Sequence, residues 1–142
     1  SHSELHAKNA SEMRQVSAWI EEGNRTDAAR FFMRIWGDGS KWADLDPLQQ
    51  TYFEERITQP CRIQPWVSDD VTGSLAELGK IEVPVLLMIG TRSPAIMEHV
   101  QNSLATRISD AQCLTIEGAT HMGLITHARD CAEGIARHLN PR

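Results

Sequence analysis

A continuous apolar run, VPVLLMIG, occupies residues 83–90. It has proline near its start, glycine at its end and no charged residue inside it. A strand buried on both faces of a parallel sheet has this composition, because helices cover both sides of the sheet and leave no polar face. We therefore expect residues 83–90 to form such a strand.

The segments after this run alternate in a regular order. A helix is expected from about Pro94 to Arg107, a second strand over 112–117, and a last amphipathic helix from about Thr126 to Leu139. Two strands joined by a crossover helix pair in parallel, but two strands alone do not make a stable sheet with two covered faces. The sequence therefore predicts that part of the sheet comes from elsewhere.

The first sixty residues have a different pattern. Helices are expected over 4–20 and 26–36, and a third from the Asp46-Pro47 pair to just before Pro60. Their aromatic residues are concentrated, and the spacing of Phe31, Phe32 and Phe53 is typical of a buried helix face. These residues predict a helical, aromatic-rich first part.

The composition of the chain argues against nucleic-acid-binding and membrane proteins. The 142 residues include 19 acidic and 14 basic ones, without a basic block that could follow a nucleic-acid backbone or an anionic membrane. No apolar stretch approaches the ~20 residues that span a bilayer. Three widely separated cysteines lack the paired spacing of zinc or redox motifs and favour a reducing compartment. We expect a cytoplasmic protein that binds neither nucleic acid nor membrane.

Three stretches carry a family resemblance. IEVPVLLMIG before Ser93-Pro94, and AQCLTIEGATHMG farther on, resemble the last two core strands of α/β-hydrolases. ARFFMRIWGDGSKWADL resembles the cap of a bacterial subgroup of cofactor-free hydrolases. The resemblance implies an α/β fold class: a helical cap over residues 1–65, then the C-terminal part of an α/β-hydrolase parallel sheet over 66–142, incomplete without an N-terminal half.

The loop after the second strand is where this family carries its catalytic histidine. The resemblance assigns that role to His121, with His127 as a second choice. A rigid sheet can aim a base at the carboxyl end of a strand toward a nucleophile. The alternative is that His121 is only a polar residue in a strand-to-helix loop.

The acid of the family is replaced in this chain. Ser93 stands where a carboxylate is expected, and it is well explained as a helix N-cap before Pro94. Asp69 or Asp70, upstream in VSDDVTG, is the candidate acid that would orient His121, although two adjacent aspartates suit a solvated turn equally well.

The Gly-x-Ser-x-Gly elbow that holds the family's nucleophile does not occur. The resemblance therefore implies the C-terminal part of a serine hydrolase of esters or related acyl bonds, with His121 as general base and the serine supplied by a missing N-terminal half or partner chain. A half-domain that self-associates is a further alternative. The rival function is a non-catalytic α/β-hydrolase-like binding or interaction protein, which Ser93 favours.

A small-molecule substrate is expected, and the rings before the core suit an apolar or aromatic one. The candidate substrate-binding residues are Trp36, Trp42, Trp66 and Met122. Because no metal cluster, phosphate-binding glycine loop or flavin motif is present in the sequence, no cofactor and no metal are implied.

Overall fold

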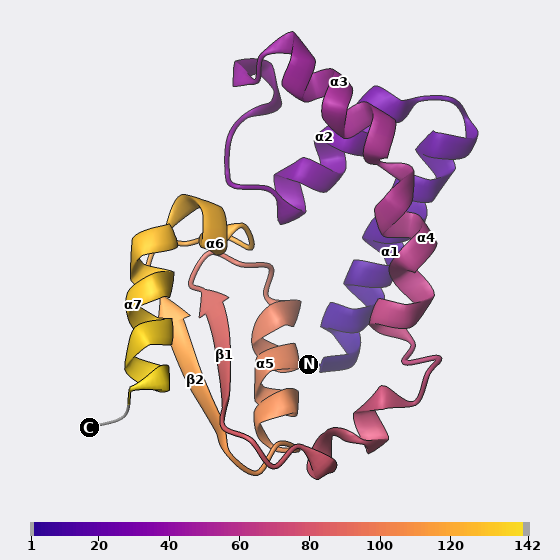
Figure 1. Cartoon of the computed structure of the whole chain (residues 1–142). Helices are drawn as coiled ribbons and strands as arrows, with labels where there is room; N and C mark the ends of the chain where they lie inside the picture. Colours follow the sequence, from indigo (N-terminus) through magenta and orange to yellow (C-terminus); the bar gives the residue numbers. More distant parts are fainter. Residues whose placement is uncertain (1, 141–142) are drawn as a thin grey trace. The chain divides into compact units, whose positions relative to one another are not determined.

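The computed structural model describes residues 2–140, and the chain divides into two compact units, Ser1–Gly73 and Ser74–Arg142. Helices make up 63% of the structure, and the described residues contain a single sheet of two strands (Figure 1). The expected fold class, an α/β fold with part of an α/β-hydrolase parallel sheet, is therefore wrong. The chain is mostly helical, because one strand–helix–strand segment supplies all the strand residues of the described part, and the regular elements before it are helices and single helical turns.

The first unit consists of the helices α1 (His2–Glu21), α2 (Arg25–Trp36), α3 (Pro47–Arg56) and α4 (Thr58–Ser68), with the single turn η1 (Trp42–Asp44). Its helices pack around the buried residues Val16, Ala28, Ala29 and Ile57. The predicted apolar residues Phe31, Phe32 and Phe53 pack against this centre. Rings also meet edge to face, as in the Trp19–Phe31 pair with centroids 5.4 Å apart.

Polar side chains fix where α2 and α3 begin. The Asn24 side chain accepts a hydrogen bond from the Asp27 N–H at 3.4 Å. The Asp46 carboxylate accepts from the N–H groups of Leu48 and Gln49 at 2.8 and 3.0 Å, and the Gln49 side chain accepts from the Asp46 N–H. This reciprocal capping box, with proline at the first helical position, confirms the helix start predicted at Asp46-Pro47.

Helix α4 was not expected from the sequence. The sequence predicts that the helical part ends before Pro60, but Pro60 lies in the first turn of α4, where a backbone N–H has no helical partner to lose. The helix therefore continues to Ser68, with Pro65 inside it. The division expected after residue 65 lies within α4, and the two compact units divide after Gly73.

The second unit begins with two single turns, η2 (Ser74–Ala76) and η3 (Leu78–Lys80). The elements that follow are β1 (Val85–Gly90), α5 (Ile96–Ala105), β2 (Ala111–Ile116), α6 (Gly123–Thr126) and α7 (Ala128–Leu139). The strands pair in parallel, from Val85 beside Ala111 to Gly90 beside Ile116. This confirms the parallel pair expected from the crossover helix.

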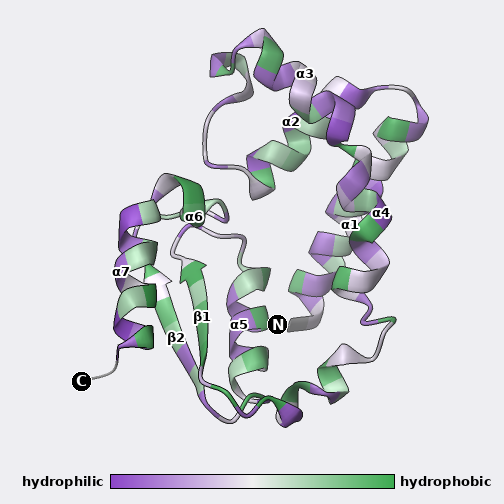
Figure 2. Ribbon diagram, viewed as in Figure 1, coloured by the Kyte–Doolittle hydropathy of each residue, from purple (hydrophilic) through white to green (hydrophobic). Residues whose placement is uncertain are grey.

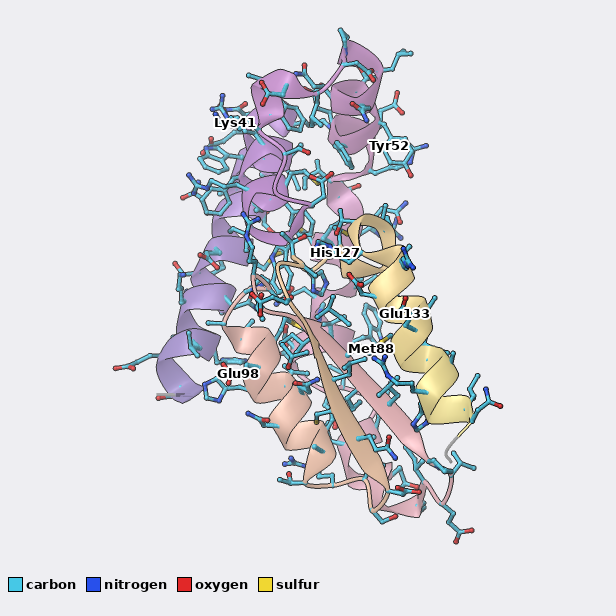
Figure 3. All side chains as sticks on the ribbon, turned by 90° about the vertical axis from the view of Figure 1, so that its left-hand side faces the viewer. Lys41, Tyr52, Met88, Glu98, His127 and Glu133 are labelled. Atoms are coloured by element: carbon cyan, nitrogen blue, oxygen red, sulfur yellow. The ribbon has the colours of Figure 1, made fainter. Side chains whose placement is uncertain are left out.

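Helices α5 and α7 lie on opposite sides of the sheet (Figure 1). On the α7 side, Met88, Leu114 and Ile116 pack with the buried Cys131, and Figure 3 shows Met88 on the side that faces α7. On the other side, the buried Gln101 of α5 donates a hydrogen bond to the Leu87 carbonyl at 2.8 Å. Coverage of both faces explains the unbroken apolar composition of β1, which Figure 2 shows in the hydrophobic colour.

The register of the β1–β2 pair also determines which backbone groups of β1 form hydrogen bonds with β2. The Val85 N–H donates to the Asp110 carbonyl at 2.9 Å, and the Thr91 N–H donates to the Ile116 carbonyl at 3.0 Å. Alternate residues of a parallel strand direct their N–H and C=O groups to the same neighbour. Leu86 and Met88 therefore direct theirs to the outer edge of β1, where no other described strand lies.

Candidate functional site

A cavity of about 360 Å³ opens in the second unit at the carboxyl ends of β1 and β2. Most of its wall is apolar, with polar groups only from Ser93, Thr120, His121 and Cys131 beside the backbone. The remaining lining residues are Met88, Ile89, Gly90, Met97, Ile116, Ala119, Gly123 and Leu124. An apolar hollow with a few convergent polar groups is the usual form of a small-molecule site.

The loop that carries His121 is packed directly on the end of β1. A Cβ atom on Gly90 would lie 2.2 Å from the Ala119 carbonyl oxygen, so only glycine allows this approach. The same carbonyl accepts a hydrogen bond from the Arg92 N–H at 2.8 Å. The Thr91 hydroxyl accepts from the N–H of Gly118, whose positive φ of 74° turns the loop. These contacts fix the backbone on which His121 stands.

The side chain of His121 lines the cavity while keeping an exposed side. Partial burial against the apolar wall lowers the pKa of His121 from its ordinary value of 6.5. The imidazole is therefore largely neutral at neutral pH, with one ring nitrogen able to accept a proton. This is the protonation state that a general base requires.

The polar residue that follows β1 in the cavity wall is Ser93. Among the described residues no carboxylate lines the cavity, and Ser93 lies there instead. Ser93 is not a helix N-cap, because α5 begins at Ile96 with Ala95 before it; the Ser93 N–H donates to the Gly90 carbonyl at 3.0 Å. Asp69 and Asp70, the candidate acids, belong to the first unit, directly after α4.

The candidate substrate-binding residues are distributed over both units. Trp36 ends α2 and stacks on Phe32, and Trp66 stands on α4 with 59% of its surface exposed. Trp42 lines another cavity within the first unit. Met122 is half-buried and precedes α6, and its N–H donates to the Thr120 hydroxyl at 3.3 Å.

The second-choice histidine, His127, stands between α6 and α7. Its Nδ1 lies 2.9 Å from the Thr126 hydroxyl, and its Nε2 would lie 3.6 Å from a Cβ on Gly118. His127 does not line the cavity.

Of the residues that line the cavity, sequence reasoning named His121 as a site residue and missed the others, Met97 and Cys131 among them. Met97 and Cys131 each stand in the first turn of a helix that follows a strand, a position beside the carboxyl ends of the strands. That position, where ligands of α/β segments commonly bind, is the signal that could have identified them.

No cluster of three histidine, cysteine or acidic side chains in the described part of the chain could hold a metal ion. Within residues 2–140 no helix combines the length and the apolar character needed to cross a bilayer. Comparison of the chain with protein-family models, curated proteins and solved structures finds no match.

Proposed function

We propose that the Ser74–Arg142 unit contributes a general base, His121, to the cofactor-independent hydrolysis of an ester or related acyl bond. The nucleophile in this proposal is a serine from a preceding segment or a partner chain. The observation that supports it most is the position of the His121 imidazole at the rim of an apolar cavity, where partial burial lowers its pKa. The sequence motif GATHMG, which resembles the catalytic-histidine loop of serine hydrolases, agrees with this role.

The proposed reaction proceeds in two stages. His121 takes the proton of the serine hydroxyl as its oxygen attacks the substrate carbonyl carbon, and returns that proton to the leaving alcohol. Water then attacks the acyl group, with His121 accepting the water proton and returning a proton to the serine oxygen as the acid leaves. The imidazole is neutral at the start of each stage, which its lowered pKa favours.

The cavity wall supports an apolar acyl or alcohol portion as the substrate. Met88, Met97 and Leu124 offer flexible apolar surface, and the volume of about 360 Å³ suits a small molecule. Asp69 or Asp70 stays the proposed acid, and Trp36, Trp42, Trp66 and Met122 stay proposed substrate contacts. A reducing cytoplasm stays the proposed location, which the three free thiols support.

The test uses the native protein isolated together with any chain that accompanies it. A fluorophosphonate probe should label a serine in that assembly, and p-nitrophenyl butanoate should be hydrolysed. His121→Ala should lower turnover roughly 10²- to 10⁴-fold, because a positioned base contributes about that factor. His127→Ala is the matched control, since its imidazole lies outside the cavity, and should keep most of the turnover. An assembly that neither reacts with the probe nor loses turnover on His121→Ala refutes the proposal.

The second candidate is a binding protein without catalysis, favoured by Ser93, which lines the cavity and stands at the sequence position where the resemblance leads us to expect the acid. It predicts that an apolar neutral molecule binds beside His121 and leaves unchanged. Native mass spectrometry separates the partner alternatives: an unlike second chain supports the two-part enzyme, whereas copies of this chain alone support the self-associating protein.

A further inference from the structure

A second cavity, of about 300 Å³, lies within the first unit between the end of α2 and the loop that leads to η1. Three cationic side chains, Arg30, Arg34 and Lys41, line it together with three apolar ones, Met33, Trp42 and Leu45. Its wall therefore combines positive charge with an aromatic and aliphatic surface. The cavity beside His121 has no lysine or arginine among its described lining residues.

The positive charge of this cavity is only partly balanced. Arg30 pairs with Asp27. Asp38 also lines the cavity, but its carboxylate accepts the Ser40 N–H at 2.9 Å, which lowers the pKa of Asp38. Arg34 and Lys41 form no ion pair among the described residues, and the guanidinium of Arg34 lies over the Phe31 ring at 4.8 Å. In a chain of net charge −5 this local excess of cations is a distinct feature.

The loop that forms the cavity wall is held in place from several sides. A Cβ on Gly37 would lie 2.3 Å from the Met33 carbonyl oxygen, and Gly39 has a positive φ of 95°. The side chain of Gln50 donates to the carbonyls of Trp42 and Leu45 at 2.9 and 3.3 Å. A wall fixed in this way loses little conformational entropy when a ligand binds.

We propose that this cavity binds a small organic carboxylate. The carboxylate group lies between Arg34 and Lys41, and the apolar body lies against Met33 and Trp42. A guanidinium matches the planar carboxylate through paired hydrogen bonds, and the lysine ammonium adds a second charge. The largely apolar wall selects a body such as an aryl or alkyl group over a purely inorganic anion. This inference is independent of the role proposed for His121.

Isothermal titration calorimetry of the full 142-residue chain with 4-phenylbutanoate tests the proposal. The uncharged 4-phenylbutanamide, which has the same apolar body, is the matched ligand. We expect 4-phenylbutanoate to bind more tightly than the amide, and its Kd to rise with ionic strength, because exposed charges are screened by salt. Equal binding of the amide, no detectable binding of the carboxylate, or tighter binding of phenyl phosphate would overturn the assignment.

Variants locate the binding in this cavity. Lys41→Gln and Arg34→Gln should each weaken 4-phenylbutanoate binding roughly threefold, the order expected for one exposed charge contact, whereas Lys41→Arg should retain it. Arg129→Gln removes one exposed positive charge from the second unit and should leave the Kd unchanged. Circular dichroism confirms that each variant keeps its helices. A Kd that ignores both Lys41→Gln and Arg34→Gln in folded protein refutes the proposal.

Discussion

Gly90→Ala tests how the loop that carries His121 is held at the end of β1. The added Cβ would lie 2.2 Å from the Ala119 carbonyl oxygen, 2.5 Å from the Ala119 carbonyl carbon and 2.8 Å from the Thr120 carbonyl oxygen. Non-bonded contacts of carbon are favourable at about 3.5 Å or more, so the loop must move by roughly 1 Å. All three atoms belong to the backbone, so a rotamer change cannot relieve the overlap.

The expected cost combines two effects. Overpacking of this kind costs about 1 to 3 kcal/mol, and moving the Ala119 carbonyl also disturbs the hydrogen bond that it accepts from Arg92 at 2.8 Å. Loss of that bond adds about 1 kcal/mol. We therefore expect Gly90→Ala to lower the free energy of unfolding by about 2 to 4 kcal/mol.

Urea unfolding followed by far-ultraviolet circular dichroism measures this difference. Gly79→Ala is the matched control in the same unit, because its Cβ would meet nothing closer than the Arg107 carbonyl at 3.9 Å. The control should stay within about 0.5 kcal/mol of the parent chain. If Gly90→Ala behaves like Gly79→Ala, the close packing of the loop on β1 is refuted.

The other predictions concern protonation, capping and thiol exposure. Burial disfavours the imidazolium of His121, so the NMR titration of this residue should have a midpoint below 6.5, and a midpoint at or above 6.5 would contradict the reasoning. The free energy of unfolding should fall as the pH drops below 6.5, because the unfolded chain binds the proton more tightly. His121→Gln should reduce that loss of stability. Asp46→Ala should cost about 1 kcal/mol in thermal unfolding by removing the capping box, whereas Asp44→Ala, in the turn η1, should cost less than about 0.5 kcal/mol. Cys113 is exposed and Cys131 buried, so a thiol reagent followed by peptide mass spectrometry should label Cys113 in the native protein and Cys131 only on unfolding; equal rates would refute the assigned burial.

Local signals in the sequence predicted local structure well. The apolar run before Gly90 forms a strand, and the Asp46-Pro47 pair begins a helix, because each depends on residues only a few positions apart. Pro60 gave the wrong expectation for the same reason. Proline is unfavourable in the interior of a helix but is tolerated in the first turn. Which of the two applies to Pro60 depends on the residues that follow it, because they form α4.

Local sequence signals could not predict the number of strands in the sheet or the residues that surround the site. IEVPVLLMIG has the composition of a strand in a large parallel sheet, yet the same composition fits a pair of strands covered by α5 and α7. The Ser93-Pro94 pair predicts an N-cap at Ser93, whereas the Ser93 N–H donates to the Gly90 carbonyl and α5 begins only at Ile96. The position of His121 beside a cavity follows from its place after a strand, but the pairing of a distant carboxylate with it depends on tertiary geometry that no spacing reveals.

The outer edge of β1 has a consequence for the exchange of backbone protons with solvent deuterium. The amides of Leu87 and Ile89 face β2, whereas those of Leu86 and Met88 face the edge where no described strand lies. Protection should therefore alternate residue by residue along a single strand, slow at Leu87 and Ile89 and fast at Leu86 and Met88. When anything pairs with that edge, the alternation disappears, so the exchange rates of two amides report directly whether the sheet has gained a strand.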